Sequence, residues 1–516
     1  MGNGILKQIE LAMKKLNQLV LSSLEKNEKL ILPTNEQLKY PERVLQFGTG
    51  VLLRGLPDHY IDQANREGRF NGRIVVVKST SHGEINSFDE QDCLYTLSVR
   101  GIQSAEVVDY SILNSSISRV VSAKENWNDI LECASNPDLQ VIISNTTEVG
   151  IVLMDDDIHA NPPTSFPGKL LSFLFRRYCN FNGSHDAGMV ILPTELISDN
   201  GSKLFNILIE LAHKNNLNDR FIDWLKDSNY CCNTLVDRIV PGKMSDDDIK
   251  KSQQALGYQD ELMIMAEPFS LWAIESDSPR VKEILSFVDS NNGCFIVPDI
   301  EKFKELKLRL LNATHTFSCG LSFLANFELV RSTMKDATMH FFITQLSHNE
   351  IVSAITSSSI NEDEATVFAT NVLERFSNPF IDHKWSAIAA QYSSKMRMRS
   401  IPLIVSYYQK EKRIPICMAL GFAGFLLFMK CKPDLQNSYW GELNGIPYKI
   451  NDDNAAYFSS LWDCNDTATV VDKTLSDKAF WGTDLSELEG FKEEVIKYLH
   501  AMINEGVANR VSALNF

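Results

Sequence analysis

The chain has 516 residues, 44% of them hydrophobic and 22% charged, which is the ordinary balance of a globular protein with at least two domains. Its formal net charge of −16 repels phosphate backbones and anionic lipid, so nucleic acid and membrane surfaces are not expected as partners. The ten cysteines lack the spacing of a zinc site or a disulfide framework, so we expect reduced thiols, no metal and a cytoplasmic location. Oligomeric state is left open by these numbers.

Residues 1–40 are predicted to form a charged, helical leader, whose role the sequence does not reveal. It has no apolar stretch of the kind found in signal peptides. The most apolar run of the chain, 418–429, is too short to cross a bilayer and is predicted to be a buried helix.

Four short apolar segments predict the strands of an α/β sheet: Val44–Phe47, 73–79, Val141–Ser144 and 188–196. Because helical stretches separate them, the sheet is expected to be parallel. "LYTLSVRG" and "AEVVDYSIL" predict an inserted antiparallel pair. From residue 298 helical spacing dominates. The sequence therefore predicts an α/β domain over 1–297, including the leader, and a mostly α-helical domain over 298–516.

A glycine turn, "FGTGVLLRG", directly follows the first predicted strand. A Rossmann turn at this place presents backbone N–H groups to a pyrophosphate. Gly48 would permit the tight turn and Gly50 the close approach of the phosphates, although Leu53 occupies the third glycine position of the usual pattern. The residues expected to contact the cofactor here are Phe47, Gly48, Thr49, Gly50 and Arg54, the last adding charge beside the phosphates.

Lys78 ends the second predicted strand, where NAD sites often place an acidic residue for the ribose hydroxyls. A lysine here would accommodate the 2′-phosphate of NADP, or would simply be solvated. These residues alone leave the choice between NAD and NADP open.

The stretch "KLRLLNATHTF", 307–317, reads as an amphipathic helix with three polar groups. At 100° per residue, Asn312 and His315 are neighbours, and Lys307 lies 80° from His315 and 140° from Asn312. A desolvated lysine exchanges a proton near neutral pH, and the other two groups would hold a carbonyl oxygen. The alternative is a solvent-facing lysine with two satisfied polar groups.

The pattern K-x-x-x-x-N-x-x-H resembles the signature of the mannitol dehydrogenase family of long-chain, metal-independent polyol dehydrogenases. Further motifs resemble the uronate branch of that family: "YPERVLQFGTGVLLRG", "ISNTTEVGI", "LPTELISDNG", "CNTLVDRIVPG", "LNATHT" and "RFSNPFIDHKWSAIA". The chain departs from that branch in having "GTGVL" where G-E-G-N-F is usual, at the turn expected to contact the cofactor.

The resemblance implies a Rossmann-type domain, a helical domain and a cleft between them, with NAD as the cofactor. It implies Lys307 as general acid/base, with Asn312 and His315 binding the reacting oxygen. Asn145 and Thr147 stand where the third strand meets the cofactor. Glu148 and Asp237 match acidic positions near the lysine, and Glu195 stands where mannitol-type members carry an asparagine near the substrate.

A sugar-acid substrate needs a cation for its carboxylate, for which an arginine fork is best suited. The candidates are Arg375, Lys395 and Arg397, of which Lys395 and Arg397 match a K-x-R element of the uronate branch, and Arg399 lies in the same loop. A solvated basic loop is the plain alternative.

The activity implied by the resemblance is the reversible, NADH-dependent reduction of D-tagaturonate to D-altronate without a metal. Reduction of fructuronate to mannonate, or a mannitol- or fructose-type reaction, is the nearest alternative. A catalytically inactive nucleotide-binding relative and a metal-dependent dehydrogenase are more distant ones.

Overall fold

The computed structural model describes residues 13–25, 28–79, 85–146, 150–242, 244–463 and 466–512. Its contacts divide the chain into two compact units. Unit 1 comprises Met1–Arg100 with Val107–Ile300, and unit 2 comprises Gly101–Glu106 with Glu301–Phe516. Residue 297, where the sequence places the domain boundary, is the last residue of strand β13 (Cys294–Val297).

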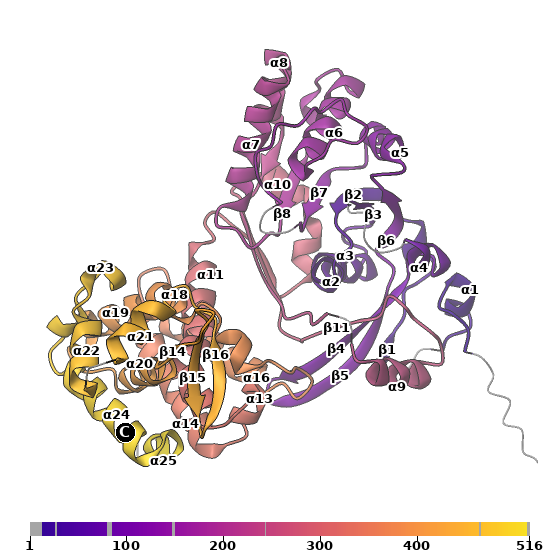
Figure 1. Cartoon of the computed structure of the whole chain (residues 1–516). Helices are drawn as coiled ribbons and strands as arrows, with labels where there is room; N and C mark the ends of the chain where they lie inside the picture. Colours follow the sequence, from indigo (N-terminus) through magenta and orange to yellow (C-terminus); the bar gives the residue numbers. More distant parts are fainter. Residues whose placement is uncertain are drawn as a thin grey trace, which may run out of the picture. The chain divides into compact units, whose positions relative to one another are not determined.

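Six parallel strands form the central sheet of unit 1 (Figure 1). Their order is β6 (Ile117–Ser122), β3 (Arg73–Lys78), β2 (Glu42–Phe47), β7 (Val141–Ser144), β8 (Val190–Pro193) and β9 (Tyr230–Cys231). Numbered along the chain this is 3-2-1-4-5-6, the strand order of the Rossmann fold. The expected α/β class is therefore confirmed, with β2, β3, β7 and β8 at the four predicted segments.

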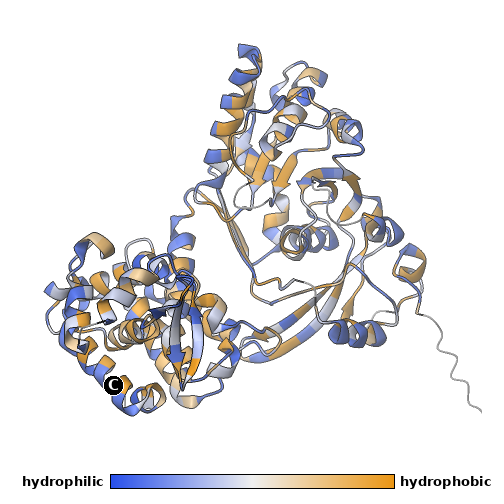
Figure 2. Cartoon of the chain, in the orientation of Figure 1, coloured by the Kyte–Doolittle hydropathy of each residue, from blue (hydrophilic) through white to orange (hydrophobic). Residues whose placement is uncertain are grey.

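Both faces of this sheet are buried, because successive side chains of each strand enter different cores. Val44 and Val76 pack with helices on one face, and Leu45 and Val75 pack with helices on the other. The helices of the first face are α2 (Val51–Gly55), α3 (Pro57–Arg66) and α4 (Asn86–Glu90). Those of the second are α5 (Trp127–Glu132), α6 (Phe166–Asn180), α7 (Asn200–Lys214) and α8 (Asp219–Ser228). Figure 2 shows the hydrophobic character of the strands between them.

Two smaller sheets of the described chain lie in unit 1, apart from the hairpin tip Gly101–Glu106, which belongs to unit 2. The predicted antiparallel pair is confirmed as β4 (Tyr95–Gln103) and β5 (Glu106–Asn114), joined by Ser104 and Ala105 with φ of 53° and 63°. Two left-handed residues are what a two-residue type I′ hairpin turn requires. Strand β11 (Ile264–Ala266) extends this sheet beside β4, while β10 (Thr234–Asp237), β12 (Leu271–Glu275) and β13 form another. Helices α9 (Asp246–Leu256) and α10 (Pro279–Ile284) precede β11 and β13.

The prediction of a helical leader is wrong for the described part of residues 1–40. Only α1 (Gln18–Leu21) is α-helical there, and the Asn17 side chain caps its first turn. Strand β1 (Leu30–Ile31) then pairs in parallel with β5. The apolar residues that suggested a helix, such as Leu16 and Leu30, instead bury against Leu113 and Tyr258 in a separate core.

Unit 2 is mostly helical, as expected. Its first half contains α11 (Glu301–Glu305), α12 (Thr314–Leu324), α13 (Val330–Thr333), α14 (Ala337–Thr344), α15 (Val352–Ile355), α16 (Glu362–Phe376), α17 (Trp385–Ile388), α18 (Tyr392–Lys395), α19 (Ile401–Glu411) and α20 (Ile416–Phe428). After a small antiparallel sheet of β14 (Lys432–Pro433), β15 (Tyr439–Leu443) and β16 (Ile446–Ile450) come α21 (Ala455–Trp462), α22 (Thr467–Leu475), α23 (Lys478–Trp481), α24 (Phe491–Glu505) and α25 (Val507–Ser512).

In the described part of unit 2, three segments are π-helical: η5 (Leu306–Ala313), η6 (Gln345–Ile351) and η7 (Met396–Ser400). Segment η5 packs against both η6 and η7. Each one joins two α-helices without a break, as η5 joins α11 to α12. Helical turns of this wider kind are rare and occur frequently at functional sites.

The predicted buried helix at 418–429 is confirmed as α20, which packs against α12 and α24. A Cβ atom added at Gly320 of α12 would lie only 2.6 Å from the carbonyl oxygen of Gly424 in α20, so glycine lets the two backbones approach closely. Among the described residues, no helix combines the length and the apolar character that crossing a membrane requires.

Candidate active site

The glycine turn of unit 1 follows β2 at the carboxyl end of the central sheet. Gly48 has φ of +126°, and its N–H donates to the carbonyl of Val77 in β3 over 3.0 Å. A Cβ at Gly48 would lie 2.9 Å from Leu53 Cδ1 and 3.0 Å from the Asn145 carbonyl oxygen, whereas a Cβ at Gly50 would meet nothing within 4 Å. The turn therefore needs glycine at Gly48 for its own geometry, and leaves open space beside Gly50.

The other predicted cofactor-contacting residues of the turn, Phe47, Thr49 and Arg54, differ in how deeply they are buried. Phe47 is fully buried and packs edge-on against Phe166, with ring centroids 5.2 Å apart, while Thr49 is half-buried. Arg54 is buried and donates to the carbonyl of Leu262 within the core of unit 1. Its guanidinium lies over the ring of Tyr95, and burial lowers its pKa. This placement argues against the expected contribution of Arg54 to phosphate binding.

Asn145 and Glu195 order the carboxyl ends of β7 and β8. The Asn145 amide donates to the carbonyl and hydroxyl oxygens of Thr194, both over 3.0 Å. The Glu195 carboxylate, 4% exposed, accepts from the Ser144 hydroxyl at 3.1 Å and from the N–H and hydroxyl of Thr146 at 2.8 and 3.0 Å. Glu195 therefore fixes the backbone directly after β7, a structural role that the sequence did not reveal.

The remaining predicted residues of unit 1 are more scattered. Lys78 is half-buried at the end of β3, beside the glycine turn. Asp237 is buried at the end of β10, which belongs to the smaller sheet of β10, β12 and β13. Thr147 and Glu148 lie outside the described residues.

In unit 2, Lys307 and Asn312 lie on the π-helical segment η5, and His315 is the second residue of α12, the α-helix that follows. The expected offset of 140° between Lys307 and Asn312 assumed an α-helix and is wrong here. Because π-helical hydrogen bonds join residues five apart, these two residues are separated by about one turn of the helix. Both side chains are half-buried. The wider turn therefore brings the lysine and the amide closer to one face.

Side chains support the backbone where the π-helix ends. The Thr316 hydroxyl donates to the Asn312 carbonyl over 2.8 Å, and the Tyr392 hydroxyl donates to the Thr316 carbonyl over 2.7 Å. Tyr392 also accepts from the Gly320 N–H at 2.9 Å. Tyr392 thus fixes the first turns of the helix that carries His315.

His315 is 7% exposed and sits among aromatic rings. Its imidazole stacks on Phe376, with centroids 3.9 Å apart, and meets the rings of His383 and Trp385 edge-on at 5.2 and 5.9 Å. Burial lowers the pKa of His315 well below its usual value, and the positive charges of its neighbours lower it further. These effects favour the neutral imidazole of His315. Its buried Nε2 has no hydrogen-bond partner among the described residues.

The positive charges that act on His315 come from separate elements of unit 2. Arg375, at the end of α16, is 6% exposed and precedes the stacked Phe376. Lys395, the last residue of α18, donates to the Ile388 carbonyl over 2.8 Å, and burial lowers its pKa. Arg399 of η7 also contributes, whereas Arg397 of the same segment is exposed.

The structure thus brings His315, Arg375 and Lys395 together with Arg399, which was noted in the sequence but not selected, and with His383, which was missed. The alternation of basic residues and methionine along "KMRMR" was the sequence signal that included Arg399. It did not show which of the two arginines is the more buried one. No group of three or more His, Cys, Asp or Glu side chains suited to a metal occurs in the part of the chain that the structure describes.

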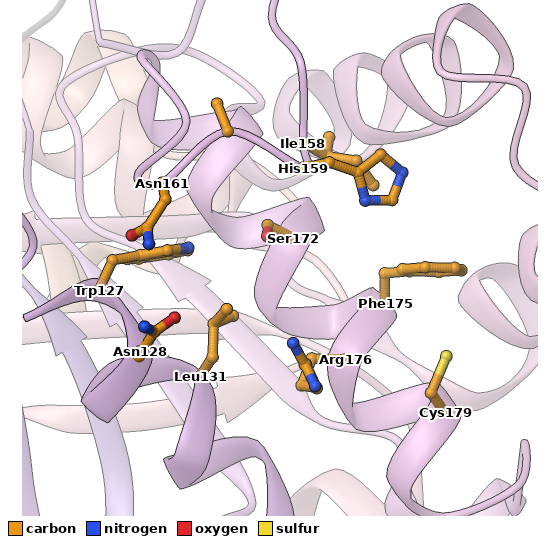
Figure 3. A pocket seen from close by; sticks show the side chains of 11 residues that line it. Trp127, Asn128, Leu131, Ile158, His159, Asn161, Ser172, Phe175, Arg176 and Cys179 are labelled. Carbon is orange, nitrogen blue, oxygen red and sulfur yellow. The ribbon is translucent and has the colours of Figure 1, made fainter.

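A pocket of about 380 Å³ lies elsewhere on unit 1, between α5, α6 and residues 158–161 (Figure 3). Trp127 of α5 and Phe175, Arg176 and Cys179 of α6 line it. None of the predicted site residues lines it, so this pocket is separate from the candidate active site.

A parallel sheet in the Rossmann order, with a glycine turn after its first strand, defines an enzyme of the dinucleotide-binding class. Residues 42–284 match the mannitol dehydrogenase Rossmann domain and residues 299–503 match the mannitol dehydrogenase C-terminal domain. The chain belongs to the mannitol dehydrogenase family. It is therefore an oxidoreductase that acts on a CH–OH group.

Two curated relatives are similar over nearly the whole chain. The altronate oxidoreductase of Halalkalibacterium halodurans is 35% identical over 484 residues, which cover 92% of this chain and 93% of the relative. That of Bacillus subtilis is 34% identical over 465 residues, covering 90% and 93%.

Two solved structures share the fold. The Pseudomonas fluorescens mannitol 2-dehydrogenase, in a ternary complex with NAD and D-mannitol, superposes with a TM-score of 0.66 at 21% identity, covering 96% of this chain and 98% of the other. A substrate-free D-sorbitol dehydrogenase gives 0.78 at 19% identity, covering 96% and 100%.

Proposed function

We propose that this enzyme catalyses the reversible, NADH-dependent reduction of D-tagaturonate to D-altronate, with Lys307 as general acid/base and no metal. The observation that carries the substrate class is the group of positive side chains around the neutral His315 in unit 2. An anionic sugar acid suits such a site better than a neutral polyol does. The similarity to altronate oxidoreductases over some nine-tenths of the chain supports the same choice.

NAD fits the glycine turn of unit 1. Gly50 has open space where a side chain would stand, so its backbone is accessible to a pyrophosphate. NAD is also the cofactor of the Pseudomonas fluorescens mannitol 2-dehydrogenase complex, which has the same fold. When bound, NADH supplies the hydride that is added to the keto carbon.

Residues of unit 2 transfer the proton to the keto oxygen of the substrate and stabilise the charge that develops on that oxygen. Protonated Lys307 gives a proton to the keto oxygen as the carbon is reduced, which leaves a CH–OH group, and the neutral amine regains a proton from water. Asn312 and His315 donate hydrogen bonds to this oxygen while negative charge develops on it. His315 can do so without adding a charge, because its environment keeps the imidazole neutral. In the oxidation, neutral Lys307 accepts the proton.

A substrate panel tests this function. D-tagaturonate, D-fructuronate and D-fructose are each offered with NADH, and then with NADPH, and consumption of the cofactor is followed by its absorbance. We expect the highest kcat/KM for D-tagaturonate with NADH. Strong turnover of fructose with none of tagaturonate would overturn the substrate assignment. NADH binding without turnover of any ketose would favour an inactive nucleotide-binding relative.

A further inference from the structure

Arg399 differs from the other basic residues of its segment in how it is held. The guanidinium of Arg309 in η5 donates to the carbonyls of Met398 and Arg399, each over 2.9 Å, and is itself paired with Glu305 at 2.9 Å. The backbone of Arg399 is thereby fixed to the π-helical segment that carries Lys307 and Asn312. Two residues earlier on the same segment, Arg397 is exposed.

The Arg399 side chain has unused hydrogen-bonding capacity. It is half-buried, its Nε is buried without a hydrogen-bond partner, and it makes no ion pair among the described residues. Burial of its guanidinium lowers its pKa. A desolvated cation without an anion is costly, so a site of this kind gains most from an anionic ligand.

The other cations are less suited to a carboxylate. Lys395 already donates to the Ile388 carbonyl, and Arg375 has an interaction of its own. Arg397 is exposed, where an ion pair contributes little. Arg399 combines a planar fork of donors with partial burial and a fixed backbone, and these properties suit bidentate carboxylate binding.

We propose that Arg399 is the specificity-determining residue that binds the carboxylate of the sugar acid. This inference rests on the proposed function, and it replaces Arg397 by Arg399 as the arginine that selects an acid over a neutral ketose. Arg399 discriminates between substrates and does not take part in proton transfer. Its loss should therefore affect acidic substrates far more than neutral ones.

The test compares Arg399→Gln with the matched control Arg397→Gln on the same segment, using D-tagaturonate and its neutral counterpart D-tagatose. For Arg399→Gln we expect kcat/KM with tagaturonate to fall about 30- to 100-fold, mainly through KM, since hydrogen bonds to charged groups are the strong ones. Turnover of tagatose and the Kd of NADH should stay within about threefold. Arg397→Gln should leave both substrates within about threefold, and Arg399→Lys should recover part of the loss.

The outcomes separate this inference from the function on which it rests. If the wild-type enzyme reduces tagaturonate but Arg399→Gln matches Arg397→Gln, the role of Arg399 is overturned and the function stands. Equal losses on the two substrates with an unchanged melting temperature would also overturn it, because they indicate a general positioning role. If the wild-type enzyme reduces no hexuronate, both proposals fall.

Discussion

The glycine turn of unit 1 and the π-helical segment η5 of unit 2 prepare their sites in opposite ways. In the turn, the conformation of the backbone shapes the site, because Gly48 adopts a φ that other residues rarely adopt. Leu53 replaces the third glycine of the usual pattern without loss of the fold. In η5, a non-standard helix positions particular side chains, Lys307 and Asn312. Substitutions should therefore act through backbone shape in unit 1 and through chemical identity in unit 2.

The largest effect is expected for Lys307→Ala. Removing a general acid/base should lower kcat by roughly 10²–10⁴-fold, while the Kd of NADH, measured by fluorescence titration, stays unchanged. Glu301→Ala, at an exposed position of α11, the helix that runs into η5, serves as a control and should keep the wild-type kcat. Activity of Lys307→Ala within about tenfold of wild type would exclude the proposed role of Lys307. It would also contradict the expectation that substitutions in unit 2 act through the chemical identity of the side chain.

Alanine at Gly48 and at Gly50 should separate the shape of the turn from its contact with the cofactor. Gly48→Ala places a Cβ within 3.0 Å of neighbouring atoms at positive φ, so it should lower the free energy of unfolding by about 1–3 kcal/mol and weaken NADH binding. Gly50→Ala meets no protein atom within 4 Å, so stability should be kept while NADH binds at least about tenfold more weakly. Thermal unfolding and fluorescence titration measure the two quantities. Unchanged NADH affinity in Gly50→Ala would show that the cofactor does not approach this backbone.

The sequence predicted those features of the two regions that leave a local pattern in the chain, and missed those that do not. Strands β2, β3, β7 and β8 were predicted because continuous apolar runs and glycine turns are local features. Lys307, Asn312 and His315 were selected as candidates by their spacing and by family resemblance, and their roles stay predictions. The π-helical winding was not, because nothing in "KLRLLNATHTF" distinguishes it from an α-helix. Without that winding, the inward position of Arg399 and the outward position of Arg397 were not predictable either.

Glu350, on the π-helical segment η6, gives unit 2 a pH dependence. Its buried carboxylate accepts from the N–H groups of Cys417 and Met418, both at 2.8 Å, and burial raises its pKa to about 7 from 4.5. Because the folded state holds this proton more tightly than the unfolded chain, the stabilisation is complete below about pH 4.5. It is lost as the pH rises through about 7.

The prediction is a melting temperature that falls between pH 5 and pH 8 in the wild type and falls less steeply in Glu350→Gln. The full contribution is on the order of 3 kcal/mol. Glu362→Gln, at an exposed position of α16, is the control and should keep the wild-type slope. Identical slopes in all three proteins would show that Glu350 does not titrate in this range.

The smallest effect is expected from a metal chelator. Because the proposed mechanism gives proton transfer to Lys307 and needs no Lewis acid, activity after prolonged treatment with EDTA and gel filtration should be unchanged. A loss that Zn²⁺ restores would contradict the mechanism and assign the chemistry to a metal instead of to η5.

The short strand β1 has a practical consequence for anyone who works with this enzyme. It lies at the outer edge of its sheet and pairs with Ser111 and Ile112 of β5. Deleting residues 1–40 would uncover the backbone N–H and C=O groups of β5, which is how exposed edge strands recruit other chains and aggregate. We therefore expect that removing the segment, whose role the sequence does not reveal, lowers solubility before it lowers activity.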